Sequence, residues 1–517
     1  MMQRHAFGKV GRLACLMLLP AALSFAGAPP SQYGVDAPEL APLGAFAVGV
    51  KTLRLVQPNQ ADPLTSDAAG GFAKRDRVLV VDLWYPAHVA FGAARVTYAA
   101  TLPSEPPAAP AAFSVPGIAV RDAPTEGGGY PLVIVSHGYS NATVAMSWLT
   151  ENLASKGYVV AAIRHEDPPI TDRSKFSQLL LRRPLDIAFV AQALQSTLTS
   201  QRLVDASRVA LIGYSMGGYG VLTVAGVTLD PTASPTRTVP GGLLLPYTRG
   251  GASLESLSVK GLRAVVAMAP AGGGTLAAWG AEGLRALRTP LLLIAGDQDR
   301  TVNYLTGARA FFDAATNAPR YLLTLENCGH AIGLNPVPDA MRGKLWDQDW
   351  FEDPVWSKSR INSISAHFIT AFLDRYVKGM EARAAFLDVS VVESSAGEWP
   401  PGGSAYNSFS PGGANTVWKG FQRNHASGMQ LMRAAAAPRP GVDDQDATQN
   451  QCCTDREFRL DRIVQQRDAE QHAEQRRKQC HQHQTRDQVT PQQPEPEQIT
   501  CDDDDQCLEQ QRYDGGA

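Results

Sequence analysis

The residues best able to do chemistry in this sequence lie in the segment GYSMG, residues 213–217. An apolar run typical of a buried strand precedes this segment, and small residues that can begin a helix follow it. A serine between two glycines, on a sharp turn from strand to helix, is the pattern of a nucleophile elbow. The glycines leave room where such a turn is too tight for Cβ atoms. We therefore predict that Ser215 is the nucleophile of a serine hydrolase.

A serine hydroxyl needs a base within hydrogen-bonding reach, and that base needs an acid to orient it. His330 is the candidate base, in the segment CGH that follows the apolar run 321–325. Asp299 is the candidate acid, in the segment GDQD that follows the apolar run 289–295. Asp297 of the same segment is expected to bond backbone amides of its turn instead. The order serine, acid, histidine, each just after a strand, favours this assignment.

Attack on an acyl carbon creates an oxyanion, which requires hydrogen-bond donors already in place. We expect one donor to be the backbone N–H of Met216, the residue after the nucleophile. The other is expected to be the N–H of Tyr139, in the segment SHGYS at residues 136–140. His137 in that segment is expected to be structural. This chemistry requires no cofactor and no metal, and the sequence has no phosphate loop or dinucleotide fingerprint.

Short apolar runs alternate with helical patterns through the middle of the chain, which indicates a doubly wound, mostly parallel α/β sheet. The predicted strands are residues 77–85, 131–136, 158–163, 209–213, 263–268, 291–295 and 321–325, and the predicted helices are 145–156, 185–198 and 361–377. Residues 29 to about 75 are expected to be a loose lead-in and residues 102–129 a surface loop. An insertion at about residues 229–260 is interpreted as a lid lining the acyl pocket, with an ordinary surface loop as the alternative.

The two ends of the chain differ from the middle. Residues 1–26 resemble a secretory signal, with a basic start and an apolar stretch, so we expect an exported protein, periplasmic or secreted, with no membrane span after signal removal. Residues 29–437 are the expected catalytic domain. Residues 438–517 are rich in Gln, Asp and Arg and poor in apolar residues, which predicts a disordered low-complexity tail.

Composition narrows the classes of partner. The formal net charge of −3 over 517 residues, without a basic stripe, argues against nucleic-acid binding. Between the predicted signal and residue 440, Cys328 is the only cysteine, so no disulfide framework is expected there. The expected partner is a small-molecule or lipid ester, and the sequence does not indicate an oligomeric state.

Four segments together resemble one family: LWYPA at residues 83–87, HG at 137–138, RPLD at 183–186 and GYSMGG at 213–218. They resemble the bacterial predicted dienelactone hydrolases, which are alpha/beta-hydrolases similar to the secreted platelet-activating-factor acetylhydrolases. The resemblance spans about residues 45–435. It implies the alpha/beta-hydrolase fold and a carboxylic-ester hydrolase, for short acyl chains or for a phospholipid acetyl ester. Dienelactone hydrolases carry cysteine at the nucleophile position, so the serine here argues against a dienelactone substrate.

Two other classes of function are compatible with the same scaffold. An acyltransferase or a peptidase would use the same residues, and release of carboxylic acid in water without an acceptor alcohol would favour hydrolysis. A non-catalytic binding protein on a hydrolase scaffold would be expected to have lost a catalytic residue or an elbow glycine. The sequence retains all of them.

Overall fold

The computed structural model describes residue 34 and residues 36–66, 71–102, 111–168, 172–337, 351–399 and 415–438. The chain divides into two compact units, Met1–Ala437 and Pro438–Ala517. The predicted signal at residues 1–26 lies outside the described residues, and so does the predicted tail apart from Pro438. Among the described residues, no helix is both long and apolar enough to cross a membrane.

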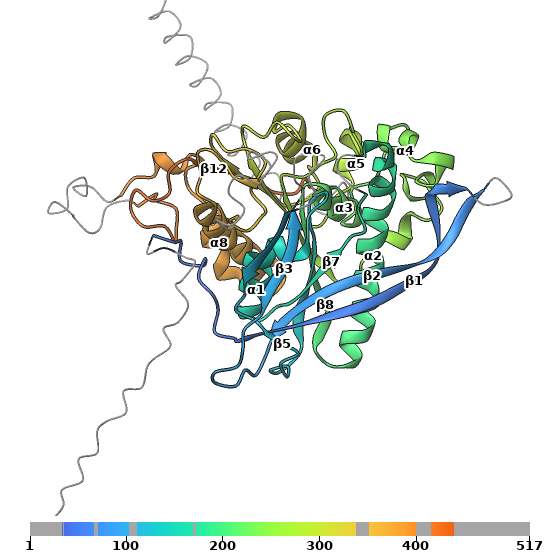
Figure 1. Cartoon of the computed structure of the whole chain (residues 1–517). Helices are drawn as coiled ribbons and strands as arrows, with labels where there is room; N and C mark the ends of the chain where they lie inside the picture. Colours follow the sequence, from blue (N-terminus) through green and yellow to red (C-terminus); the bar gives the residue numbers. More distant parts are fainter. Residues whose placement is uncertain are drawn as a thin grey trace, which may run out of the picture. The chain divides into compact units, whose positions relative to one another are not determined.

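One ten-stranded sheet forms the centre of the described chain, in the order β12-β11-β10-β9-β8-β6-β7-β2-β1-β5. Figure 1 labels β1, β2, β5, β7, β8 and β12 of this sheet. Its middle six strands are parallel to one another: β6 (Tyr130–Ser136), β7 (Val159–Arg164), β8 (Val204–Tyr214), β9 (Leu262–Met268), β10 (Leu291–Gly296) and β11 (Arg320–Leu325). The outer strands β12 (Met429–Ala434), β2 (Phe72–Pro86) and β1 (Val48–Ser66) pair antiparallel, and the short β5 (Val120–Arg121) runs parallel to β1. The predicted doubly wound, mostly parallel sheet is confirmed.

Helices cover both faces because the strand side chains alternate between two cores. On β6, Val133 and Val135 belong to one buried cluster, whereas Leu132 and Ile134 belong to the other. The first cluster includes side chains of α1 (Ser147–Ser155) and α8 (Lys358–Tyr376). The second includes side chains of α2 (Phe176–Ser200), α3 (Met216–Val224), α5 (Gly280–Arg285) and α6 (Ala310–Ala314).

Shorter elements connect these layers. They are the strands β3 (Thr97–Leu102) and β4 (Ala111–Pro116), the helix α4 (Ser234–Thr238), and single turns at η1 (Thr143–Met146), η2 (Arg173–Lys175), η3 (Pro240–Gly242), η4 (Leu245–Tyr247), η5 (Leu254–Leu257), η6 (Leu305–Arg309), η8 (Glu381–Phe386) and η9 (Ser394–Ala396).

Two expectations for the N-terminal part are wrong. The loose lead-in contains the long strand β1, which pairs with β2 from Val48–Pro86 to Ser66–Phe72. The surface loop contains β4, which pairs with β3, and also β5. Pro58 lies where the β1–β2 register shifts between Gln57 and Gln60. A proline at such a bulge is compatible with a strand, but in the sequence alone it resembles a break.

The strand order brings distant segments to one edge of the sheet. β7 lies on one side of β6 and β8 on the other. The loops after β6 and β8 therefore leave the same carboxyl edge side by side, which is where ligands bind in open α/β sheets. The loops after β10 and β11 leave the same edge two and three strands beyond β8.

Candidate active site

The turn between β8 and α3 has the geometry of the predicted elbow. Ser215 has φ 53° and ψ −116°, a backbone conformation that is strained for a residue other than glycine. A Cβ on Gly213 would lie 2.3 Å from the carbonyl oxygen of Gly217. A Cβ on Gly217 would lie 1.9 Å from the carbonyl oxygen of Ser136. Both glycines are therefore needed sterically, and the elbow packs directly on the backbone of the loop after β6.

The structure brings together the three residues expected from the sequence. The Ser215 Oγ lies 3.1 Å from His330 Nε2, and His330 Nδ1 lies 2.7 Å from Asp299 Oδ2. All three residues are buried, with 6%, 5% and 3% of their surface exposed, respectively. A carboxylate only accepts hydrogen bonds, so Nδ1 carries the imidazole proton. The lone pair of Nε2 then faces the serine hydroxyl, which is the arrangement that removes its proton.

Backbone donors fix the orientation of the Asp299 carboxylate. Its second oxygen, Oδ1, accepts the N–H groups of Thr301 at 2.9 Å and Val302 at 3.1 Å. Asp297 instead accepts the backbone N–H of Asn327 at 2.7 Å through its Oδ1, which is the turn role expected for it. The two aspartates of this loop therefore have separate partners.

The loop that carries His330 is held from two sides. The Tyr214 ring stacks on the imidazole with 5.3 Å between ring centroids, and its hydroxyl donates to the His330 carbonyl oxygen at 3.0 Å. The Gly329 N–H donates to Asp353 Oδ2 at 2.7 Å. Lys358, the first residue of α8, donates to the carbonyl oxygen of Ala331. The helix α8, predicted at 361–377, therefore packs beside the loop that carries the histidine.

A cavity of about 640 Å³ opens onto Ser215. Met216 and Tyr139, the two residues expected to supply oxyanion donors, also line it. The other lining residues come mainly from two segments that follow β9 and β10, namely 271–276 and 300–306, together with Phe176 and Thr238. Among the described residues of this lining, Arg300 is the only charged one. The cavity is thus apolar for most of its wall, with one guanidinium.

The insertion at about residues 229–260 contributes only Thr238 to that lining. Leu244 of the insertion is fully buried in the cluster that includes α2 and α3, and Leu243 and Tyr247 pack against the same cluster. The expectation that the insertion lines the acyl pocket is therefore wrong apart from this one threonine. Its apolar side chains cover the core instead of the cavity.

His137 is structural, as expected. It is 2% exposed, and burial, with a smaller effect from the Arg183 charge, lowers its pKa to about 3. The neutral ring donates from Nδ1 to the Gly138 carbonyl oxygen at 2.7 Å and accepts the backbone N–H of His165 at Nε2, 3.3 Å away. His367 is likewise a core histidine, because it is fully buried and accepts the Leu40 N–H.

A second hydrogen-bonded chain of serine, histidine and aspartate begins at Ser136, the last residue of β6, and it was not identified from the sequence. Ser136 Oγ lies 2.9 Å from His165 Nε2, and His165 Nδ1 lies 3.1 Å from Asp186 Oδ2. Arg77 donates to both Asp186 oxygens at 2.8 Å. Burial alone would raise the pKa of Asp186, but Arg77 and His165 outweigh it and the pKa lies below its usual range. Of these four residues, none lines the cavity at Ser215. In the sequence, the only sign of this second chain was the RPLD segment at residues 183–186, which contains Asp186.

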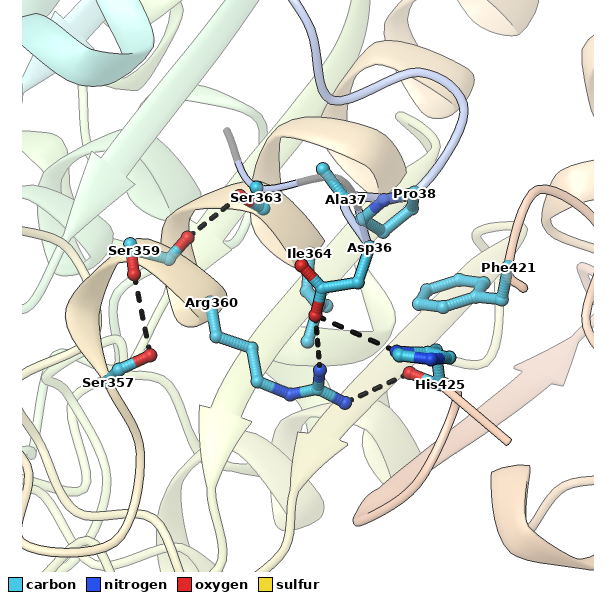
Figure 2. Close-up of a pocket in the computed structure, with 11 residues that line it drawn as sticks. Asp36, Ala37, Pro38, Ser357, Ser359, Arg360, Ser363, Ile364, Phe421 and His425 are labelled. Carbon is cyan, nitrogen blue, oxygen red and sulfur yellow. Dashed lines mark hydrogen bonds and ion pairs between the residues drawn. The ribbon is translucent and has the colours of Figure 1, made fainter. Parts of the chain in front are cut away.

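Figure 2 shows a smaller cavity, of about 180 Å³, whose lining contains none of the three predicted catalytic residues. Its charged side chains already have partners. Asp36 forms an ion pair with Arg360 at 3.5 Å, its carboxylate lies 3.7 Å from His425 Nδ1, and Arg360 also donates to the His425 carbonyl oxygen. We therefore assign no substrate to it. Within the described ranges, no group of three or more His, Cys, Asp or Glu side chains could hold a metal ion.

Comparison with known proteins agrees with this architecture. A family model described as PETase, PET hydrolase-like, matches residues 117–233, a range that includes Tyr139 and Ser215 but not Asp299 or His330. The chain is an alpha/beta-hydrolase. The family expected from the elbow and from the Trp-Tyr-Pro and His-Gly segments is thus confirmed at the level of the superfamily.

The relatives of this alpha/beta-hydrolase include cutinases. Cutinase 2 of Thermobifida cellulosilytica is 26% identical over 222 residues, which is 43% of this chain and 67% of the cutinase. Cutinase cut1 of Thermobifida fusca is also 26% identical, over 43% of this chain and 55% of its own. Cutinase est1 of Thermobifida alba is 33% identical over 22% of this chain and 36% of its own. The matches thus span about two thirds or less of each cutinase. Their names agree with the predicted class of carboxylic-ester hydrolase.

A solved structure is also similar. It is a ferulic acid esterase from Streptomyces cinnamoneus, with a TM-score of 0.45 and 22% identity, covering 66% of this chain and 94% of the esterase.

Proposed function

We propose that this chain hydrolyses carboxylic esters through an acyl-enzyme on Ser215, with His330 as base and Asp299 as orienting acid. The observation that carries the proposal is the unbroken hydrogen-bond chain from Asp299 through His330 to Ser215, at the wall of a cavity that Ser215 itself lines. A base already hydrogen-bonded to a serine beside an open cavity is what nucleophilic catalysis requires.

In the first half of the reaction, His330 Nε2 takes the Ser215 proton as Oγ attacks the acyl carbon. The oxyanion that forms is stabilised by the N–H groups of Met216 and Tyr139, the two expected donors. The imidazolium, stabilised by Asp299, returns its proton to the alkoxide as the alcohol leaves. In the second half, His330 takes a proton from water as the water attacks the acyl-enzyme. The imidazolium then returns this proton to Ser215 Oγ as the carboxylic acid leaves, which regenerates the free serine.

The cavity favours small to medium acyl groups. Its volume of about 640 Å³ lies within the usual range for small-molecule sites. Three consecutive glycines, residues 272–274, form part of the wall, and a Cβ on Gly273 would lie 2.1 Å from the carbonyl oxygen of Thr306, which also lines the cavity. We propose short-chain esters as substrates, with a phospholipid acetyl ester as one member of the class. Because residues 1–26 have the pattern of a secretory signal, we also propose that the protein acts after export.

A series of p-nitrophenyl esters from acetate to palmitate tests this function. We expect turnover to be highest for short chains and to fall by about 10⁴-fold or more in Ser215→Ala. Ser363→Ala is the matched control, because this buried serine donates to a helix carbonyl on α8 and does not line the cavity. Wild-type turnover in Ser215→Ala would refute the proposal. Product that appears only when an acceptor alcohol or amine is present would identify an acyltransferase instead.

A further inference from the structure

The peptide group between Gly138 and Tyr139 is fixed by hydrogen bonds to its carbonyl oxygen. Its N–H, on Tyr139, is the expected second oxyanion donor. Its carbonyl oxygen, on Gly138, accepts two hydrogen bonds, from His137 Nδ1 at 2.7 Å and from Arg183 Nη2 at 3.2 Å. In a planar trans peptide the C=O and the N–H point in opposite directions. Donors that fix the carbonyl therefore also fix where the N–H points.

Arg183 binds the loop at further points. Its Nη1 donates to the His137 carbonyl oxygen at 2.5 Å and to Ser136 Oγ at 3.3 Å. The guanidinium is 1% exposed and forms an ion pair with Asp167, whose carboxylate also accepts the backbone N–H of Ser140 at 3.1 Å. One buried ion pair thus contacts the loop from residue 136 to residue 140.

The surrounding helices place Arg183 at this point. A Cβ on Gly220 of α3 would lie 3.2 Å from the Arg183 Cβ, so glycine lets α3 approach α2 closely here. Pro184 has no N–H to donate to the Leu180 carbonyl one turn earlier. That carbonyl oxygen accepts the hydroxyl of Tyr219 from α3 instead, at 3.0 Å. The Arg-Pro pair therefore joins α2 both to the helix after the nucleophile and to the loop beside it.

We propose that Arg183 is a positioning residue for the oxyanion hole: its guanidinium orients and polarises the Gly138–Tyr139 peptide, so that the Tyr139 N–H donates more strongly to the oxyanion formed at Ser215. A cation at the carbonyl oxygen draws electron density from the peptide nitrogen, and a buried setting screens this effect little. The inference rests on the proposed function, because it requires an oxyanion at Ser215.

The test compares transition-state binding with ground-state binding. The main variant is Arg183→Met combined with Asp167→Asn, so that no buried carboxylate is left without its cation. Arg183→Lys keeps the charge but not the planar fork. The matched control is Arg182→Met, since Arg182 is also buried on α2 but its guanidinium donates to Gln60 of β1 at 3.1 Å. Thermal unfolding is recorded for each, and Arg183→Lys alone carries the test if the double variant does not fold.

Three quantities are measured: kcat and KM for p-nitrophenyl acetate, the affinity for a trifluoromethyl ketone that adds to the serine, and the affinity for the matching methyl ketone. Loss of a whole oxyanion donor lowers kcat by about 10²–10³-fold. For the double variant we expect a fall of about 10²-fold, and for Arg183→Lys about tenfold, with KM within twofold. Trifluoromethyl ketone affinity should fall by the same factor as kcat, while methyl ketone affinity and the control variant stay unchanged.

A merely structural role predicts a different pattern. Equal weakening of both ketones, a rise in KM alone, or wild-type kcat in the double variant or in Arg183→Lys would overturn the inference. These results are distinguishable from failure of the proposed function, in which wild-type protein shows no hydrolysis that depends on Ser215.

Discussion

Replacing Asp299 by asparagine tests the site at the atom that sets the histidine tautomer. The side-chain amide has two possible orientations. With its oxygen toward His330, its NH₂ would face the N–H groups of Thr301 and Val302, and two buried hydrogen bonds would be lost. With its NH₂ toward His330, both backbone bonds remain. At about 1 kcal/mol or more for each lost bond, the second orientation is favoured by about 2 kcal/mol, or roughly 30-fold.

That orientation inverts the imidazole. An NH₂ group facing Nδ1 at 2.7 Å requires Nδ1 to accept, so the ring proton moves to Nε2. Nε2 then donates toward Ser215 and is unable to take its proton. We expect kcat for p-nitrophenyl acetate at pH 7.5 to fall by about 10⁴-fold, with little change in the thermal midpoint, because the variant is nearly isosteric.

Asp297→Asn is the control for this experiment. It lies in the same loop, but its carboxylate accepts only a turn amide among the described residues, so we expect kcat within about twofold of wild type. If Asp299→Asn retained more than a tenth of wild-type kcat, or if Asp297→Asn lost as much activity as Asp299→Asn, the assignment of the acid would be wrong.

Two further predictions concern stability. Gly217→Ala should lower the free energy of unfolding by about 3 kcal/mol or more, measured by urea unfolding, because its Cβ would lie 1.9 Å from the Ser136 carbonyl oxygen. Gly129→Ala, at a residue with φ +68° and open space around it, should lower the free energy of unfolding by only about 1 kcal/mol. Burial lowers to about 3 the pKa of three histidines, His137, His165 and His367. Between about pH 6.5 and pH 3, the unfolded chain therefore binds protons at these histidines that the folded chain does not. The free energy of unfolding should fall over this range as the pH is lowered, by about 1.4 kcal/mol per pH unit for each histidine. Urea unfolding between pH 7 and pH 4 should show this slope, and His367→Gln should reduce it; an unchanged slope would contradict the assignment.

The central strands were predictable because each is an apolar run buried on both faces. The predicted runs at 131–136 and 291–295 match β6 and β10 to within one residue at each end. β1 was missed because it lies near the sheet edge, where polar and apolar residues alternate and Pro58 accompanies a register shift. β12 was missed as well, since it is an edge strand whose pairing with β11 depends on chain more than 100 residues away. Edge pairing is a tertiary effect that a local pattern does not encode.

The three predicted catalytic side chains were accessible to sequence reasoning because each follows a buried strand in a fixed order. The support around them was not. Thr301 and Val302 hold Asp299 through backbone N–H groups that any residue except proline would supply. Arg183 reaches the loop after β6 from α2, 45 residues away along the chain. A contact of that kind is determined by how the helix packs on the sheet, so the RPLD segment could be noticed in the sequence without its role being evident.

Two serine–histidine–aspartate chains occur in this molecule, and their surroundings differ. Ser136, His165 and Asp186 are linked at 2.9 Å and 3.1 Å, distances similar to those at Ser215. Two differences separate them. Ser136 Oγ also accepts a hydrogen bond from Arg183, and the Asp186 charge is neutralised by Arg77, so the serine oxygen is engaged and the aspartate is less able to stabilise an imidazolium. Ser136 is also not among the residues that line the cavity at Ser215, where an acyl carbon would approach. The hydrogen-bond pattern of a triad is therefore insufficient for a functional assignment, and the open cavity at Ser215 is the observation that distinguishes the proposed nucleophile from Ser136.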